Sequence, residues 1–369
     1  MRLALREMRR RPGRFVIAVV LLTLVAALLM LLGGLLDGLI ARSIGAIEAQ
    51  RADLVTFSST AERSFLRSRI DPATREAVAA VPGVARVGGL GVLQVGARVP
   101  GNGPRDLVDV ALFGYEIAPQ GVPRPPRLGE AYADRLLEDS GVRVGQQLLV
   151  GPARTPVEVV GFVDDVSYSG AGTLWASAAT WRRAQEQNKP NAAVASGVFQ
   201  ALVVDGTRDA AALARAVDEA SGGATETVTV AEAADSVGGV REQRSVFNQI
   251  IGVTVVIAIV VIALFFALLT VERTALYGIL KAIGARSQTL FGGVVLQAVI
   301  VAAIAAAIGG VLALVFDALI PSGAIPYQLV PGRVVTSAVS LVLAAVAGST
   351  FSLRRVLRID PASAIGSST

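Results

Sequence analysis

Four long apolar runs constrain this chain of 369 residues more than any other feature. They cover residues 15–36, 250–270, 290–320 and 334–351. An α-helix rises about 1.5 Å per residue, so about 20 apolar residues cross the roughly 30 Å hydrocarbon core of a bilayer. Each run therefore predicts a membrane-spanning helix, and the fourth is just long enough.

The first run has a competing interpretation as a secretory signal peptide. Six arginines precede it, and the last four make a positive segment like that of such a peptide: Arg9, Arg10, Arg11 and Arg14. The run is longer than the roughly 7 to 15 apolar residues of a signal peptide, which favours a membrane helix.

Positive charge gathers beside the apolar runs. Residues 41–249 contain 21 Arg or Lys against 24 Asp or Glu, whereas the rest of the chain contains 13 against 5. This is the distribution that the positive-inside rule produces, and it argues against a nucleic-acid-binding groove. We therefore expect both termini and the 272–286 segment in the cytoplasm, with residues 41–249 outside.

The region between the first two runs predicts a globular α+β domain. Asp71 caps a helix start, and residues 84–99 read as strands punctuated by glycines. Gly89 and Gly91 begin a GxG pattern, but Gln94 stands at its sixth position and no helix opens there, so a dinucleotide site is rejected in favour of turn glycines.

A second strand and helix unit closes this domain. Residues 200–205 and 225–230 read as strands around a helix over 208–220, and the intervening region includes a short helix around 130–139. The apolar spacing also predicts a continuous helix over 231–273, about 64 Å long, as a stalk leading to the membrane.

The predicted fold is a membrane protein of four transmembrane helices with an α+β extracytoplasmic domain inserted between the first and second. The transmembrane helices are predicted over 15–40, 250–271, 290–320 and 334–353. On the cytoplasmic side we expect an amphipathic helix over 1–14, a coupling helix over 272–289 and a tail over 354–369. On the outer side we expect a loop over 321–333 and a domain with a helical stalk over 41–249, which contains a β-rich subdomain at 105–195.

Small residues and acids inside the runs offer two hypotheses. Ala298, Ala302, Ala306 and Gly310 recur every fourth residue, as Gly34 and Gly38 do, which allows helices to approach closely in static packing or in a sliding contact. Two acids, Asp37 and Asp317, lie near the outer ends of their runs. Local pairing or snorkelling is favoured there over a role in binding a substrate or ion.

The residue inventory excludes several kinds of enzyme. The chain has no His and no Cys, which removes thiolate metal sites and Ser-His-Asp or Cys-His catalysis. Neither Lys189 nor Lys281 follows a glycine, so no ATP-binding P-loop is present. Asp164 and Asp165 are adjacent and cannot face one substrate together. Trp175 reads as a core residue more readily than as a partner contact.

The segment 272–285, ERTALYGILKAIGA, lies between the second and third runs. Its charges alternate with apolar residues, and two glycines bound its turns, which predicts an amphipathic helix. A simple loop that carries positive-inside charge is the alternative.

This segment resembles the cytoplasmic signature of FtsX-like ABC transporter permeases, a group that includes MacB-like, LolC-like and DevC-like proteins. The resemblance extends to LALREMRRRPGRF near the N-terminus, VAAVPGVARV, SGVRVGQQLLVG and VEVVGFV in the large domain, and RRVLRIDPASAI at the C-terminus. It covers nearly the whole chain. It implies a multi-pass protein of the bacterial plasma membrane with both termini in the cytoplasm.

The resemblance also implies a site that contacts a separate ATPase. The residues that match the family pattern are Glu272, Arg273, Gly278, Lys281, Ala282, Gly284 and Ala285. Leu276 stands where the family usually has an acidic residue, so apolar packing replaces a polar contact there. No catalytic residue, cofactor site or metal site is expected on this chain, because ATP and Mg²⁺ would bind to the partner.

The implied function is a permease subunit, in a dimer of permeases with two ATPases, that exports, extracts or expels a hydrophobic or envelope substrate. The alternative is a signal relay without transport, which activates a cell-wall hydrolase or senses envelope stress. A membrane-embedded enzyme is disfavoured because no ionisable cluster has catalytic spacing. The sequence leaves open the substrate, the direction of movement and whether the second permease is identical.

Overall fold

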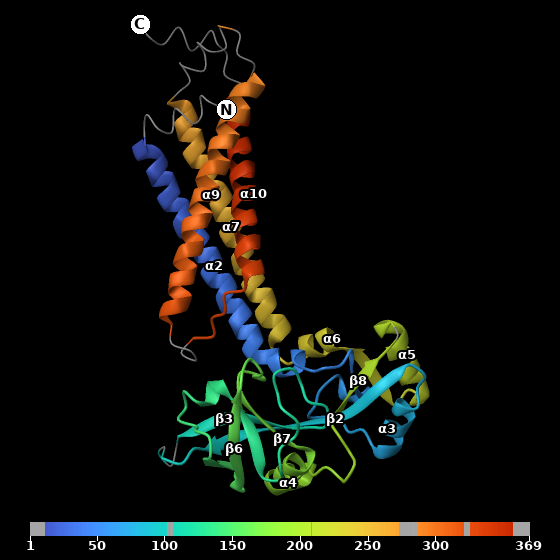
Figure 1. The fold of residues 1–369 in the computed structure, drawn as a ribbon. Coiled ribbons are helices and arrows are strands. Elements are labelled where there is room, and N and C mark those ends of the chain that lie inside the picture. The colour runs from blue at the N-terminus through green and yellow to red at the C-terminus, as the bar shows by residue number, and fades with distance from the viewer. Residues whose placement is uncertain are drawn as a thin grey trace. The chain divides into compact units, whose positions relative to one another are not determined.

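The computed structural model describes residues 12–101, 103, 106–207, 209–272, 283, 287–320 and 325–356. The chain divides into two compact units, each with its own hydrophobic core (Figure 1). The helical unit consists of Met1–Gly38, Arg244–Pro321 and Ile325–Thr369, and the inserted domain consists of Leu39–Gln243 with Ser322–Ala324.

Four helices in the described residues are long and apolar enough to cross a membrane. They are α2 (Pro12–Glu48), α7 (Val240–Val271), α9 (Ser287–Leu319) and α10 (Pro331–Val356). The sheet-rich domain lies between α2 and α7 in the sequence. The predicted fold class, four membrane helices with a domain inserted between the first two, is therefore confirmed.

Small residues bring these helices close together. Ala298 and Ala302 on α9 are fully buried in the core of the helical unit. A Cβ added to Gly309 would lie 2.8 Å from the Cβ of Ala26 on α2, and one added to Gly348 on α10 would lie 2.7 Å from a main-chain oxygen of α7. Close backbone approach of this kind is a main source of helix association in hydrocarbon.

The inserted domain is built on a nine-stranded sheet in the order β3-β7-β4-β6-β5-β2-β8-β1-β9. An additional pairing between β2 and β3 closes six of these strands into a ring, and β2 also joins the ring to β8, β1 and β9. The strands are β1 (Leu54–Ser58), β2 (Val84–Arg98), β3 (Leu107–Tyr115), β4 (Glu130–Asp134), β5 (Gln147–Val150), β6 (Thr155–Val163), β7 (Gly172–Ser177), β8 (Ala201–Gly206) and β9 (Thr225–Thr229).

Short helices pack against this sheet, and a side chain caps the start of each. They are α3 (Pro72–Ala79), α4 (Ala178–Asn188), α5 (Ala210–Ala220) and α6 (Val230–Asp235), with caps from Asp71, Ser177, Asp209 and Thr229. Three single 3₁₀ turns cover Ser59–Ala61, Arg135–Leu137 and Pro190–Ala192. The predicted helix start at Asp71 is thus confirmed.

Two predicted helices are wrong. Residues 130–139 form strand β4 and then a 3₁₀ turn, because β4 pairs with β6 and β7 and buries Ala131 and Ala133. The continuous helix over 231–273 is interrupted between Asp235 and Val240. Gly239 adopts a φ of 86° there, which a right-handed helix does not allow.

Gly89 and Gly91 lie inside the uninterrupted strand β2, so their interpretation as turn glycines is also wrong. A Cβ at Gly89 would come within 2.4 Å of the Phe199 ring, and one at Gly91 within 2.2 Å of the Trp181 ring. The two rings stack with centroids 6.1 Å apart. These glycines therefore provide the space that the aromatic core requires.

Replacing Gly91 by alanine is expected to lower the unfolding free energy of the inserted domain by about 1–3 kcal/mol, because the added Cβ overpacks the core at Trp181. Gly96→Ala, in the same strand, is the control because its Cβ would meet Leu107 at an ordinary 3.4 Å. Both tryptophans belong to the inserted domain, so denaturant unfolding followed by tryptophan fluorescence measures the difference. Equal losses in the two variants would contradict this account.

Candidate functional site

The predicted ATPase-coupling residues lie between α7 and α9. Glu272 directly follows α7 and forms a turn, and Ile283 is 79% exposed. The remaining predicted residues lie outside the described part of the chain: Arg273, Gly278, Lys281, Ala282, Gly284 and Ala285. Leu276 also lies outside it. The position of Glu272 means that a force applied to this segment reaches α7 directly along the chain.

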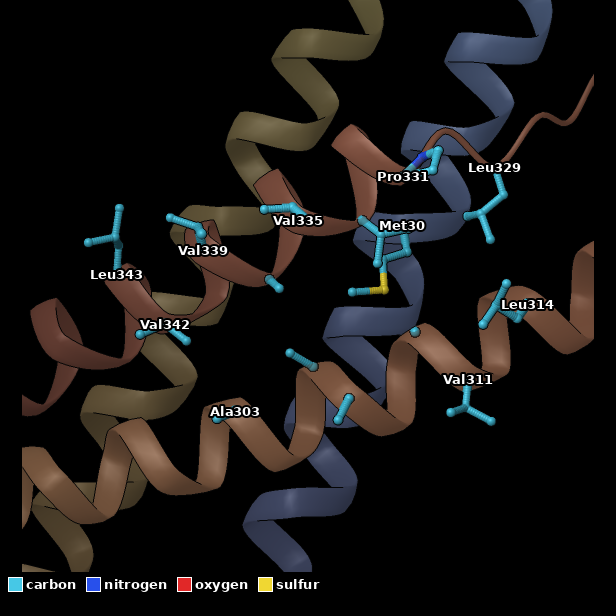
Figure 2. Close-up of a pocket in the computed structure, with 15 residues that line it drawn as sticks. Met30, Ala303, Val311, Leu314, Leu329, Pro331, Val335, Val339, Val342 and Leu343 are labelled. Atoms are coloured by element: carbon cyan, nitrogen blue, oxygen red, sulfur yellow. The ribbon is translucent and has the colours of Figure 1, made fainter.

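An apolar groove of about 800 Å³ opens between α9 and α10 in the helical unit (Figure 2). Met30 of α2 lies between these helices and is 1% exposed. The lining residues are all apolar: Met30, Ala303, Ala306, Ala307, Gly310, Val311, Leu314, Leu329, Pro331, Val334, Val335, Ala338, Val339, Val342 and Leu343. The groove can therefore accept an apolar group and offers no side-chain hydrogen bond.

Two of the four small residues that recur every fourth position on α9 line this groove. Ala306 and Gly310 line it, whereas Ala298 and Ala302 pack in the core. A Cβ added to Gly310 would keep ordinary distances of 3.8 Å to Val334 and 4.0 Å to the sulfur of Met30. Gly310 thus leaves open space, whereas Ala298 and Ala302 are fully buried between helices.

Asp37 and Arg333 form an ion pair at one end of the helical unit. The guanidinium Nε and Nη2 of Arg333 donate to the two carboxylate oxygens of Asp37, at 2.9 and 2.6 Å. The side chain of Arg333 is 32% exposed, and that of Asp37 only 16%. The pair joins α2 to the start of α10, which fits the prediction of local pairing for Asp37. Asp317 is exposed.

The segment between α9 and α10 also crosses α2 closely. The Gln328 amide donates to the carbonyl of Gly34 at 3.0 Å. A Cβ at Gly34 would lie 2.4 Å from the Tyr327 ring, and one at Gly38 would lie 2.4 Å from the carbonyl oxygen of Pro326. Gly34 and Gly38 therefore make room for an irregular segment, where the sequence pattern predicted a second helix.

A double-mutant cycle with Asp37→Asn and Arg333→Gln is expected to give a coupling of roughly 0.5 to 3 kcal/mol in unfolding free energy, because the pair is bidentate and partly buried. Thermal unfolding of the four proteins in the same detergent supplies the comparison. The exposed pair Arg67 and Glu62 serves as the control, with coupling near zero. Additive effects at Asp37 and Arg333 would show that the pair does not stabilise the helical unit.

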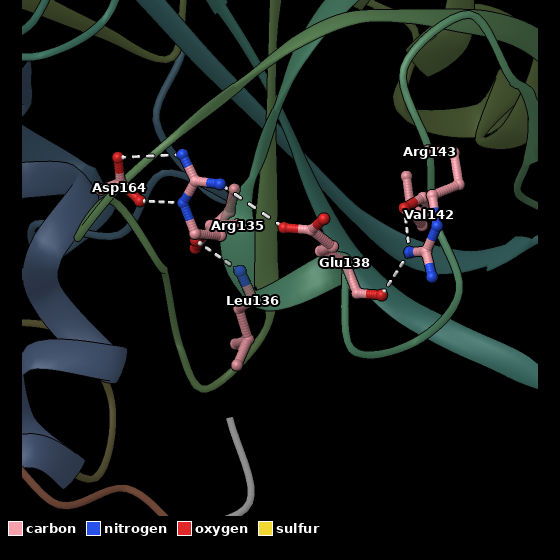
Figure 3. A network of polar contacts seen from close by, with 7 residues as sticks. Arg135, Leu136, Glu138, Val142, Arg143 and Asp164 are labelled. Atoms are coloured by element: carbon pink, nitrogen blue, oxygen red, sulfur yellow. Dashed lines mark hydrogen bonds and ion pairs between the residues drawn. The ribbon is translucent and has the colours of Figure 1, made fainter. Parts of the chain in front are cut away.

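Charged residues of the inserted domain form a surface network (Figure 3). Arg135 donates from Nε to Asp164 at 2.5 Å and pairs with Glu138 at 3.5 Å. The hydrogen bond to Asp164 raises the pKa of Arg135. These side chains are 42–61% exposed, so they are solvated structural charges. Asp164 is thus an ion-pair partner of Arg135 in this network.

Asp134 is the buried acid of this domain, at 3% exposure. Burial raises the pKa of its carboxyl group, and hydrogen bonds from the Ser167 hydroxyl at 2.5 Å and the Leu136 amide at 3.1 Å oppose that shift. Asp165 adds a smaller unfavourable charge. The ionised form of Asp134 is therefore less stable in the folded domain than in water.

Asp134→Asn is expected to stabilise the inserted domain increasingly as pH rises. A carboxyl group whose folded pKa is raised stabilises the fold below its unfolded pKa of about 3.9, and that contribution is lost as pH rises through the folded value. The difference in unfolding free energy between the variant and the parent should therefore grow above about pH 4. Denaturant unfolding across pH 3–8 measures it, and a difference independent of pH would contradict the assignment.

Tyr168, in the loop before β7, and Trp175, within β7, both belong to the core. Trp175 is fully buried and stacks on Phe113 with centroids 4.6 Å apart, so the core interpretation is confirmed. Burial raises the pKa of Tyr168 to about 12. Among the described residues, no group of three or more acids could hold a metal ion.

Residues 248–361 match the family model described as FtsX-like permease C-terminal. This region contains three of the four candidate spans almost completely, together with the whole 272–285 segment. Uncharacterized ABC transporter permeases from Mycobacterium bovis and Mycobacterium tuberculosis are 29% identical to this chain over 379 residues, which is 98% of this chain and 98% of each relative. Residues 248–361 thus match an FtsX-like permease domain, and nearly the whole chain is similar to proteins named ABC transporter permeases.

Part of the chain is also similar to a putative hemin transport system permease protein HrtB from Staphylococcus epidermidis. The two are 25% identical over 141 residues, which is 38% of this chain and 40% of the relative. Among solved structures, the periplasmic region of MacB from Actinobacillus actinomycetemcomitans aligns with 52% of this chain and 94% of its own, at 11% identity and a TM-score of 0.35. The extracellular domain of the ABC-type transporter YknZ aligns with 47% of this chain and 98% of its own, at 14% identity and a TM-score of 0.31.

Proposed function

We propose that this permease couples ATP hydrolysis by a separate ATPase to movement of its inserted domain, and so exports, extracts or expels a hydrophobic or envelope substrate. The observation that carries the proposal is the family match over 248–361, because it spans the predicted coupling segment and the helices on both sides. An ABC permease works with an ATP-binding partner. ATP and Mg²⁺ would bind to that partner, and two permease copies would pair with two ATPases.

The distribution of charge supports an orientation in a bacterial plasma membrane. Basic residues gather in the first 14 residues, the 272–286 segment and the C-terminal tail, which would lie in the cytoplasm. Arg333, at the start of α10, is the basic residue next to the opposite connection, and Asp37 neutralises it. The inserted domain would then lie on the outer side.

The predicted coupling residues would form the contact with the ATPase: Glu272, Arg273, Gly278, Lys281, Ala282, Gly284 and Ala285. Val271 ends α7 and Ser287 begins α9, so 15 residues connect the two helices. A displacement of this connection by the ATPase would act on both helices. Glu272 follows α7 immediately and would pass the displacement to that helix.

The apolar groove supports a hydrophobic class of substrate. Its lining residues carry no side-chain hydrogen-bonding group, so it could hold only an apolar part of a molecule. The partial relative from Staphylococcus epidermidis is named for hemin transport, and hemin has a large apolar ring. A large apolar or amphipathic compound is therefore the first class to test.

Gly284→Trp is expected to lower permease-dependent ATP hydrolysis by at least roughly tenfold, the effect of losing about 1.4 kcal/mol of contact free energy. The indole would occupy space at the ATPase contact. Gly252→Trp is the matched control, because nothing lies within 4 Å of a Cβ at that position on α7. The measurement uses the permease co-purified with its candidate ATPase in lipid nanodiscs.

Unchanged hydrolysis in Gly284→Trp would contradict the coupling assignment, as would failure of the parent chain to co-purify with any ATPase. Transport into vesicles separates the two forms of the proposal. ATP-dependent movement of an apolar compound supports transport, whereas hydrolysis without movement, together with capture of a cell-wall hydrolase, favours the relay.

A further inference from the structure

The last turns of α2 form an unusual contact within the inserted domain. The loop 165–170, between β6 and β7, exchanges three main-chain hydrogen bonds with the interior of this helix. The amide of Ala46 donates to the carbonyl of Ser167 at 2.9 Å. In return, the amides of Ser169 and Gly170 donate to the carbonyls of Ser43 and Arg42, at 2.8 and 3.0 Å.

Such contacts are rare, because only the last four carbonyls of a helix lack a partner within it and the amides of its last turns are already paired along the axis. Gly45 makes them possible here. A Cβ at this position would lie 2.8 Å from the carbonyl oxygen of Asp165 and 3.4 Å from the amide nitrogen of Ser167. Any other residue would hold the loop away from the helix.

The loop is itself firmly held by the sheet. The Ser167 hydroxyl donates to the buried carboxyl group of Asp134 at the end of β4. The Thr173 hydroxyl of β7 donates to the carbonyl of Val166 at 2.9 Å. Val166 and Tyr168 are buried in the same cluster as Ile44 and Ile47 of α2. The loop thus links the helix to strands of the closed ring.

The second connection of the inserted domain is built differently. Between α6 and α7 the helix is interrupted over 236–239, where Gly239 adopts a positive φ and no atom lies within 4 Å of a Cβ at Gly238. Glycine at such positions adds backbone freedom. The structure therefore has a braced connection at α2 and an interrupted one at α7.

We propose that Gly45 and the loop 165–170 form the attachment through which motion of α2 reaches the ring of the inserted domain, with the 236–239 interruption acting as the hinge. This inference rests on the proposed function, because it assigns the step that follows the ATPase contact. Gly45 is a positioning residue in this scheme. It permits the main-chain bonds that make helix and loop move as one body.

Gly45→Leu tests the attachment in the full complex with the ATPase, by hydrogen exchange with mass spectrometry. Exchange in peptides covering 42–47 and 165–171 is expected to rise at least tenfold, while exchange in β8 stays unchanged. The exchange changes that ATP produces in the strands of the ring should be lost, although ATP hydrolysis continues. Gly252→Leu is the matched control and should retain the ATP response, since that position on α7 is open.

A rescue experiment separates loss of attachment from general damage. The chain has no cysteine, so Ser43→Cys and Ser169→Cys introduce the sole thiols, at positions whose main chains are 2.8 Å apart from oxygen to nitrogen. In a Gly45→Ala background, which is the milder variant if Gly45→Leu does not fold, a thiol-specific cross-link between them should restore the ATP response. Reversal of the cross-link should abolish it again.

Three results would overturn the inference. The first is an ATP response that survives in Gly45→Leu although the 165–171 peptide exchanges freely. The second is a completed cross-link that fails to restore the response in Gly45→Ala. The third is a parent complex without any ATP response in the inserted domain, which would overturn the proposed function as well and is therefore distinguishable from the other two.

Discussion

The absence of water in the bilayer core is the constraint on which the rest of this structure depends. Main-chain amides and carbonyls there must be paired within the protein, so the spanning segments are helices. Association of the helices then depends on close packing, since lipid tails are as apolar as leucine. Gly309 and Gly348 allow that packing. Asp37 and Arg333 form a bidentate ion pair at the end of these helices.

The inserted domain is built differently, because its core depends on pairing between strands that lie far apart in the sequence. β2 pairs with β3, β5 and β8 along its length, and the rings of Trp181 and Phe199 fill the space left by its glycines. The 165–170 loop adds main-chain bonds from this sheet to α2. In the proposed mechanism, a displacement of the helix is passed on by these hydrogen bonds, which are directional, as well as by apolar contacts, which are much less so.

Local signals in the sequence were sufficient for the number of membrane helices and for the cap at Asp71, since each depends on residues close together in the chain. Gly89 and Gly91 were misread as turns because the rings that need their space come from residues 181 and 199. The interruption after Asp235 had a signal in the pair Gly238 and Gly239, which the apolar spacing on either side outweighed. The groove and the 165–170 loop had no local signal, because both arise where distant segments meet.

One consequence of the topology concerns how the inserted domain comes apart. Leu90 of β2 is paired on both of its edges, with Tyr115 of β3 and with Ala201 of β8. β2 belongs both to the six-stranded ring and to the row of strands β2-β8-β1-β9. Removing β2 from either part would leave the strand next to it with an unpaired edge. The ring and the strands β8, β1 and β9 therefore depend on the same strand, so loss of β2 would disrupt both parts of the sheet.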